Sequence, residues 1–280
     1  MAGTRSVLVT GASTGIGRAC AEDLARAGYT VYAGVRSDKD AATLTAAMPA
    51  LRPIILDVTQ PEVIAQAVER LRTDCGPIGL WGLVNNAGVV VSAPLEFLPL
   101  DQLRRQFDVN VTGQLAVTQA CLPLLRHSRG RVVFIGSSSG YFSAPLVGAY
   151  SMSKHAIEAM GDTLRQELRP WGIEVAIVQP GAIKTPIWDK SASSGNAMLQ
   201  SMPPQIHELY GPQIESVRRM GEAQAGRSSP ARVVSRAVEH ALGAARPRTR
   251  YKIGSGAQLQ RFLRWLPDRW VDAILRLALR

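Results

Sequence analysis

The chain has 280 residues, of which 46% are hydrophobic and 19% charged, the balance of a globular protein with a large buried core. No apolar run approaches the ~20 residues that cross a bilayer, and the first run, "SVLVTG", is too short for a signal peptide. The three cysteines and four histidines show no metal-ligand spacing. We therefore expect a metal-free protein with reduced cysteines, located in the cytoplasm.

The net charge is +10, from 32 basic and 22 acidic residues, and arginine recurs between Arg218 and Arg280. Such a charge suits a nucleic acid or a membrane surface. The sequence shows neither a motif that recognises nucleic acids nor a pattern of basic and aromatic residues, so we expect no nucleic-acid partner in spite of the positive charge.

Short β-rich runs alternate with helical stretches along most of the chain. The runs are continuously apolar, which is typical of strands buried on both faces. The alternation predicts an α/β fold, with one Rossmann-like, doubly wound parallel sheet and helices on both faces. The runs occupy residues 6–11, 30–36, 53–59, 80–88, 131–137 and 173–181, and the main helical stretches are 15–28, 61–73, 101–126 and 149–169.

Two segments depart from this alternation. Residues 185–229 are rich in Ser, Met, Pro and Gln and too long for an ordinary connection, which predicts a substrate lid. Residues 258–280 mix large apolar side chains with arginine, and Pro267 divides them into two amphipathic helices. We therefore expect a catalytic domain at 1–257 that includes the lid, followed by a C-terminal extension.

The C-terminal extension, residues 259–280, has two interpretations. A basic amphipathic helix can lie on an anionic membrane. The interpretation that we favour is a tail that packs over the substrate cleft or against a partner subunit.

A glycine-rich turn follows the first predicted strand, in "TGASTGIGRAC". Gly11, Gly15 and Gly17 allow backbone to approach a ligand or to adopt conformations that a Cβ would hinder. The helix that begins here offers free N–H groups to a pyrophosphate. The spacing Gly-x3-Gly-x-Gly departs from the usual dinucleotide fingerprint, so a plain tight turn is the alternative.

The stretch "AYSMSKHAIEAM" places Tyr150 and Lys154 one helical turn apart, on the same face. An exposed pair without chemistry is one interpretation. The other is catalytic, because a nearby cation lowers the pKa of a phenol and lets it exchange a proton with an alcohol or ketone oxygen.

Six motifs in order together resemble the short-chain dehydrogenase/reductase family. They are "TGASTGIG", "NNAG" (85–88), "VNVTG" (109–113), Ser137, "YSMSK" (150–154) and "PGAIKT" (180–185). The resemblance covers roughly residues 5–185, and the sheet pattern continues to "YKIGSG" (251–256), giving about seven strands. The stretches "GLWGLVNNAGV" and "RGRVVFIGSSSG" look most like the branch of retinol and 17β-hydroxysteroid dehydrogenases.

The resemblance implies four catalytic residues. Tyr150 would be the general acid/base, and Lys154 would lower its pKa and hold the nicotinamide ribose. Ser137, thirteen residues before the tyrosine, would polarise the substrate oxygen, with Ser138 and Ser139 as loop hydroxyls. Asn110 would anchor a water and the lysine in a proton relay. Hydride would pass between the nicotinamide and a carbinol carbon.

Cofactor preference depends on the end of the second strand. Val35 stands where an enzyme that prefers NAD normally has Asp or Glu, and Arg36 follows. Arg36 could pair with a 2′-phosphate, so we expect NADP(H); a solvated arginine and NAD(H) are the alternatives. Further cofactor contacts are expected from residues of the glycine turn, the third and fourth strands and "PGAIKT": Ser13, Thr14, Ile16, Asp57 (to the adenine amine), Val58, Asn86, Ala87, Gly88, Pro180, Gly181, Ile183 and Thr185.

The lid predicts a hydrophobic substrate, such as a steroid, retinoid or other lipid. Simple packing of the lid on the body is the alternative interpretation of its large apolar residues, Ile187, Trp188, Met198, Leu199, Met202 and Tyr210.

The function that we expect is an NADP(H)-dependent oxidoreductase that interconverts a hydrophobic alcohol and its ketone or aldehyde. A catalytically silent dinucleotide-binding sensor or scaffold is the alternative from another class. The complete Ser–Tyr–Lys–Asn set argues against it.

The helical stretches 101–126 and 149–169 are apolar over more than one face, so each needs a second surface to bury it. In the family these helices pair with their symmetry mates, which implies a homodimer. The apolar residues concerned are Leu115, Val117, Cys121, Leu122, Leu125, Met152, Ile157, Met160 and Leu164.

Overall fold

A computed structural model describes residues 5–187, 195, 198–200, 202–256 and 265–278. Seven parallel strands form one sheet in the order β3-β2-β1-β4-β5-β6-β9. The predicted fold class is confirmed. The strands are β1 (Ser6–Val9), β2 (Thr30–Val35), β3 (Arg52–Ile55), β4 (Gly82–Asn85), β5 (Arg131–Ile135), β6 (Glu174–Pro180) and β9 (Arg250–Ile253).

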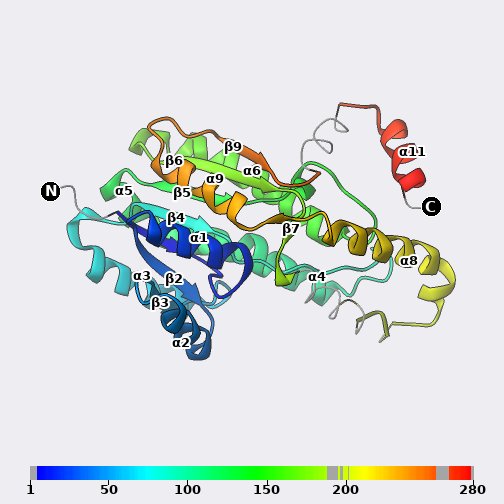
Figure 1. Cartoon of the computed structure of the whole chain (residues 1–280), viewed down its shortest axis with the longest axis horizontal. Helices are drawn as coiled ribbons and strands as arrows, with labels where there is room; N and C mark the ends of the chain where they lie inside the picture. Colours follow the sequence, from blue (N-terminus) through cyan, green and yellow to red (C-terminus); the bar gives the residue numbers. More distant parts are fainter. Residues whose placement is uncertain (1–4, 188–194, 196–197, 201, 257–264, 279–280) are drawn as a thin grey trace.

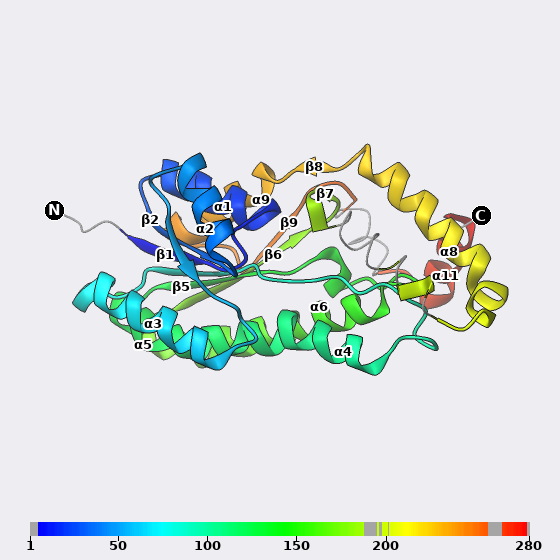
Figure 2. The ribbon, with the colours of Figure 1, turned by 90° about the horizontal axis from the view of Figure 1, so that it is seen from below.

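Helices cover both faces of this sheet (Figures 1 and 2). On one face a core cluster joins the sheet to α1 (Gly15–Arg26), α2 (Asp38–Ala47) and α9 (Arg232–Gly243). On the other face a second cluster joins it to α3 (Pro61–Cys75), α5 (Gly113–Ser128) and α6 (Gly148–Glu167), and α4 (Leu100–Phe107) lies on the same side. Both faces are therefore buried, which explains the continuously apolar runs.

Each strand is shorter than the apolar run that predicts it. β1 ends at Val9 although the run extends to residue 11, and β4 covers only Gly82–Asn85 of the run 80–88. The residues of these runs that follow the strands leave the sheet at its carboxyl edge. The strand order reverses between β1 and β4, and such a switch point opens a crevice at that edge.

The predicted lid includes the helix α8 (Gln205–Ala225). Two short strands, β7 (Ile183–Lys184) before the lid and β8 (Ser229–Pro230) at its end, pair as a small sheet. The C-terminal extension contains α11 (Asp268–Ala278), which begins directly after Pro267 as predicted. The first of the two helices expected there falls mostly outside the described residues.

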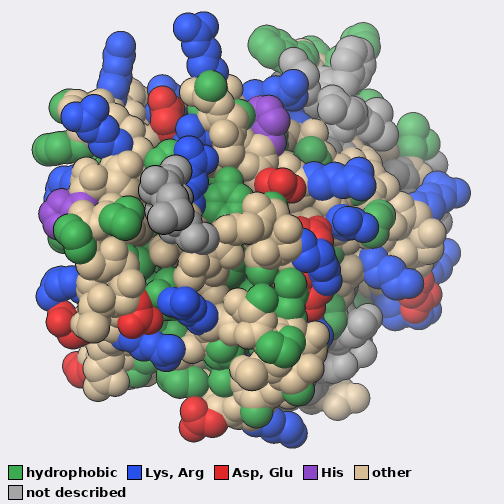
Figure 3. Space-filling view, turned by 60° about the vertical axis from the view of Figure 1, so that its left-hand side comes forward, with side chains coloured by type: hydrophobic (Ala, Val, Ile, Leu, Met, Phe, Trp, Pro, Cys, Tyr) green, Lys and Arg blue, Asp and Glu red, His purple; other side chains and the backbone are tan. Residues whose placement is uncertain are grey.

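Basic side chains are spread over the face in Figure 3, between neutral and acidic ones, and they form no single stripe there. In the part of the chain that the structure describes, no helix is long and apolar enough to span a membrane.

A ladder of four buried polar side chains runs along one side of the α4–α5 helix. They stand four residues apart, and each is 0% exposed: Gln106, Asn110, Gln114 and Thr118. An α-helix turns about 100° per residue, so a four-residue spacing drifts by about 40° at each step. The π-helical turn η2 (Asp108–Thr112) lies in the middle of this stretch. A π-helix rotates by a smaller angle per residue than an α-helix, so this turn offsets part of the drift and keeps the four side chains on one side of the helix.

The ladder holds the segment that follows β4. Gln106 Oε1 accepts from Val91 N at 2.7 Å, and its Nε2 donates to Val89 O at 2.7 Å. Asn110 Oδ1 accepts from Val89 N at 2.8 Å, and Gln114 Nε2 donates to Ala87 O at 2.8 Å. The irregular backbone after β4 therefore obtains from side chains the hydrogen bonds that a sheet would supply.

Replacing Gln106 by Leu should lower the free energy of unfolding by about 1–3 kcal/mol, because Val91 N loses its hydrogen-bond partner while buried and Val89 O keeps only Asn110 Nδ2. Gln66→Leu is the matched control: Gln66 is exposed on α3, and its replacement should cost less than about 0.5 kcal/mol. Guanidinium denaturation measures both. Equal effects would show that the ladder contributes no stability.

Candidate active site

The glycine-rich turn lies between the end of β1 and the start of α1. Gly11 and Gly15 have φ values of 63° and 59°, in the left-handed region that favours glycine. Thr14 precedes α1 in an extended conformation and makes no side-chain cap, so the amides of the first helical turn stay available to an anion. The turn therefore has the geometry of a phosphate site.

Gly17 is needed for packing within the protein. A Cβ there would lie 2.3 Å from both Asn86 Nδ2 and Gly11 O, inside van der Waals contact. The sequence predicted that glycine at this position allows close approach to a ligand or a backbone conformation that a Cβ would hinder. The structure shows that the close packing of Gly17 against Asn86 and Gly11 also requires a glycine here.

Thr10 and Asn86 join the glycine turn to the segment after β4. Thr10 Oγ1 accepts from the backbone N–H groups of Asn86 and Ala87, each at 2.9 Å. Asn86 Nδ2 donates to Thr10 O at 2.9 Å and to Gly11 O at 3.1 Å. These bonds fix the predicted residues Asn86–Gly88 beside the turn. Sequence reasoning missed Thr10, a buried hydroxyl that ends an apolar strand.

Arg36 follows β2 and is exposed. It has no hydrogen-bond or ion-pair partner among the described residues. Ala12 N donates to Gly34 O at 2.8 Å, which attaches the glycine turn to the end of β2 and brings Ser13 and Arg36 to the same edge. Val35 is only 1% exposed, so a carboxylate at that position would be desolvated.

Two further groups of predicted cofactor residues lie on opposite sides of the turn. Asp57 Oδ1 accepts from Thr59 N at 2.9 Å and Thr59 Oγ1 at 2.7 Å, and Val58 is buried. On the other side, a Cβ built on Gly15 would lie 3.3 Å from Thr185 Cβ. The "PGAIKT" segment therefore packs directly on the glycine turn, with Ile183 buried behind it.

The structure brings Ser137, Tyr150 and Lys154 together at the carboxyl end of β5. Tyr150 is 8% exposed in the first turn of α6 and hydrogen-bonds to Ser137. Lys154 is 4% exposed, and its Nζ donates to Ile135 O at 2.7 Å and lies 5.6 Å from the Tyr150 ring centroid. An exposed pair without chemistry is thus the wrong interpretation of this stretch.

The protonation of this group differs from the expectation. Burial raises the pKa of Tyr150 above its usual value, and the hydrogen bond with Ser137 acts in the opposite direction. Burial lowers the pKa of Lys154 to about 8, against the attraction of Glu158. The sequence predicted a net lowering of the tyrosine pKa by the lysine, whereas the net shift is upward because burial of the phenol outweighs the groups that favour the phenolate.

The side chain of Asn110 is fully engaged. Besides the Val89 contacts of the ladder, its Nδ2 donates to Ser153 Oγ at 3.1 Å, and Ser153 Oγ donates to Tyr150 O at 2.8 Å. Asn110 thus braces the turn of α6 that carries the tyrosine, and its amide is not directed at Lys154. Ser153 was also missed, since a small polar residue inside a helix carries no distinctive signal.

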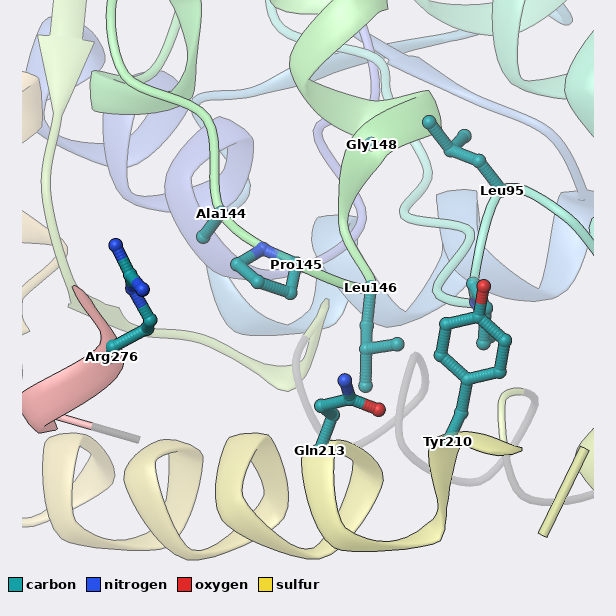
Figure 4. A pocket seen from close by; sticks show the side chains of 9 residues that line it. Leu95, Ala144, Pro145, Leu146, Gly148, Tyr210, Gln213 and Arg276 are labelled. Carbon is teal, nitrogen blue, oxygen red and sulfur yellow. The ribbon is translucent and has the colours of Figure 1, made fainter. Parts of the chain in front are cut away.

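A cavity of about 440 Å³ lies at the N-terminal end of α6 (Figure 4). It reaches Gly148, two residues before Tyr150, and most of its wall is apolar. Leu146 lines it with φ 66°, a strained value for leucine, and its carbonyl accepts from Ala93 N at 2.9 Å and Ser92 Oγ at 3.1 Å.

Of the six predicted lid residues, Ile187 and Leu199 are half-buried. Tyr210 of α8 lines the cavity, and its hydroxyl donates to Glu96 Oε2 at 2.6 Å. Met198 and Met202 pack on a small cluster with Val91 and Leu98, so these two serve packing. Trp188 lies outside the described residues.

Among the described residues, no group of three or more His, Cys, Asp or Glu side chains could hold a metal ion. The side chains that the structure brings together are a buried phenol, an ammonium and a hydroxyl, near the glycine turn.

Comparison with known proteins identifies this arrangement. The sequence model of the family described as short chain dehydrogenase matches residues 5–195. The chain belongs to the short-chain dehydrogenase family.

Several members resemble this short-chain dehydrogenase over nearly its whole length. The NADPH-dependent 3-dehydrocapnine reductase of Ornithobacterium rhinotracheale is 34% identical over 277 residues, covering 96% of this chain and 95% of the relative. Retinol dehydrogenase 7 of Mus musculus is 36% identical, covering 96% and 87%. The 11-beta-hydroxysteroid dehydrogenase type 2 of Homo sapiens is 38% identical, covering 95% and 68%. The predicted nearness to the retinol and hydroxysteroid branch is confirmed.

Solved structures of short-chain dehydrogenases share the fold. One from Streptomyces avermitilis has a TM-score of 0.78 and 29% identity, covering 98% of this chain and 94% of the other. One from Burkholderia cenocepacia, in complex with NADP, has a TM-score of 0.74 and 26% identity, covering 97% of each. This short-chain dehydrogenase is accordingly an oxidoreductase of the class that acts on CH–OH groups.

Proposed function

We propose that the chain is an NADP(H)-dependent oxidoreductase that interconverts a hydrophobic alcohol and its ketone or aldehyde. The observation that carries this is the buried Tyr150, hydrogen-bonded to Ser137 and next to a largely apolar cavity. A silent sensor would have no need for a desolvated phenol and ammonium, whose burial costs free energy. The names of two relatives, a retinol dehydrogenase and an 11-beta-hydroxysteroid dehydrogenase, support the substrate class.

The residues present fit a dinucleotide. The pyrophosphate would lie on the free amides after the glycine turn, with the adenosine half towards Asp57 and Arg36. The nicotinamide half would lie towards Lys154 and the 180–185 segment. When bound, the nicotinamide supplies or accepts the hydride.

In reduction, Ser137 Oγ would donate to the substrate oxygen, and Tyr150 Oη would transfer its proton to that oxygen. The raised pKa of Tyr150 keeps Oη protonated at neutral pH, as a proton donor must be. The pKa of Lys154, about 8, leaves its ammonium mostly charged at neutral pH, where it stabilises the phenolate that the transfer leaves behind. The protonated Tyr150 and the charged Lys154 thus have the protonation states that reduction of a ketone requires.

Replacing Tyr150 by Phe should lower kcat for ketone reduction at least about a hundredfold, the usual contribution of a general acid. The ring remains, so NADPH binding followed by fluorescence should stay within about twofold. The assay is absorbance at 340 nm, with a panel of hydrophobic ketones and NADPH. Near-normal turnover by the variant would remove Tyr150 from the mechanism, and the absence of turnover by the unmodified protein would favour the sensor.

Cofactor preference is assigned to Arg36, since its exposed guanidinium lacks a protein partner among the described residues. The NADPH-dependent relative and the NADP-bound structure support the same choice. Arg36→Asp should weaken NADPH binding roughly ten- to a hundredfold and improve NADH binding, because a carboxylate repels a 2′-phosphate and accepts from a free 2′-hydroxyl.

Lys39→Asp is the control for Arg36→Asp, because it makes the same charge reversal at an exposed position of α2. It should leave the NADPH-to-NADH ratio of dissociation constants unchanged. An unmodified protein that binds NADH more tightly than NADPH would overturn the assignment and favour the NAD(H) alternative.

We further propose a two-fold homodimer through α5 and α6, which lie side by side on one face (Figure 2). Val117, Cys121, Leu125, Ile157 and Leu164 are buried against their own sheet. A second set of apolar side chains on the two helices is half-buried or exposed, and a partner subunit would bury it: Leu115, Leu122, Met152 and Met160.

Light scattering at micromolar concentration should give about twice the 30.2 kDa of one chain. Met152→Glu, on an exposed side chain of α6, should shift the protein towards the monomer. A fully active monomer at that concentration would refute the dimer.

We also propose that α11 makes a peripheral contact with a membrane. Trp270, Ile274 and Leu277 are exposed at positions i, i+4 and i+7, which share one face of a helix. Cosedimentation with anionic vesicles tests it, and protein that stays in the supernatant would exclude it.

A further inference from the structure

The cavity at the start of α6, two residues before Tyr150, combines apolar walls with one charged side chain. The loop before α6 supplies Ala144, Pro145 and Leu146, and Pro94 and Leu95 follow β4 in the chain. Among the described residues that line the cavity, only Arg276 carries a charge, and it comes from α11 at the other end of the chain. Figure 4 shows its side chain extending from α11 beside Ala144 and Pro145.

The charge of Arg276 is not neutralised by the described part of the protein. Its Nε donates to Asp272 O at 3.3 Å, within its own helix, and no described carboxylate pairs with it. Glu96, which follows the lining residue Leu95 in the chain, accepts from Tyr210. Tyr210 lies across the cavity from Arg276 (Figure 4).

An unpaired guanidinium next to an apolar surface favours an anion that brings its own hydrocarbon. The cavity volume of about 440 Å³ corresponds to roughly fifteen non-hydrogen atoms at ~30 Å³ each. A medium-length aliphatic chain with one anionic group has this size.

We propose that the substrate is an anionic amphiphile, whose carboxylate, sulfonate or phosphate binds Arg276 while its hydrocarbon lies against Leu95, Pro145 and Leu146. This rests on the proposed function and narrows its substrate class, since neutral steroids and retinoids carry no such charge. Arg276 is then a specificity-determining residue and takes no part in proton transfer.

Binding is measured first, by calorimetry, with decanoate, decane-1-sulfonate, decyl phosphate and the neutral decan-1-ol. The unmodified protein should bind at least one anion roughly tenfold more tightly than the alcohol, the effect of one charge-assisted contact. Arg276→Gln should remove this preference and keep affinity for the alcohol, and Arg276→Lys should retain part of it.

Arg269→Gln is the matched control, because Arg269 is exposed on the same helix but does not line the cavity. Equal affinities for anions and alcohol, or an equal loss in Arg269→Gln, would overturn the proposal. The anion that binds most tightly distinguishes the three possible head groups.

Turnover separates this proposal from the function on which it rests. The probes are oxodecanoates with the ketone at different carbons, each as the free acid and as the methyl ester, with NADPH. We expect Arg276→Gln to raise KM roughly tenfold for the acids, with kcat little changed, and to leave the esters unaffected. Esters that are reduced as efficiently as acids would overturn the anionic substrate and leave the oxidoreductase intact. Failure to reduce any probe would count against the proposed function, and the binding preference would then decide this proposal.

Discussion

The buried polar ladder on the α4–α5 helix is the constraint on which both halves of the site depend. It fixes the irregular backbone between Asn85 and Val91, since Thr118 accepts from Asn85 Nδ2 at 2.8 Å at the near end and Gln106 bonds Val91 at the far end. From this segment Asn86 reaches the glycine turn, and from the ladder itself Asn110 reaches Ser153 under Tyr150. The phosphate site and the tyrosine therefore keep their relative position through one connected set of hydrogen bonds.

The sequence predicted the sheet, and it predicted that Ser137, Tyr150 and Lys154 come together; the reasons are local. Strands buried on both faces leave continuous apolar runs, and glycine marks the positions where φ must be positive, as at Gly11 and Gly15. The ladder escaped prediction because Gln106 and Gln114 look like ordinary polar residues of a helix surface. Their four-residue spacing was visible, but its meaning depends on the neighbouring segment, which a single sequence does not place.

The roles inside the site were harder to predict than its members. Proximity in sequence suggested that Lys154 would lower the pKa of Tyr150, whereas desolvation dominates in the folded protein. Burial acts on both groups in the direction of neutrality. Glu158, one turn beyond Lys154 and paired with Arg250 at 2.9 Å, opposes this for the lysine. The edge strand β9 is thus linked to the carboxylate that favours the Lys154 ammonium, through a pairing between distant residues that no motif contains.

The two halves of the site are built in different ways, and this explains why the substrate was the least predictable part. The cofactor half consists of tight turns at the ends of adjacent strands, where backbone geometry restricts each residue. The cavity instead gathers residues 94–95, the loop before α6 with the first residue of α6, α8 and α11, four segments that are separated in the chain. Amphipathic patterns predicted that α8 and α11 would be helices but not what they would face, because a hydrophobic stripe fits any apolar surface. A side chain such as Arg276 can therefore change the substrate class without disturbing the turns that bind the cofactor.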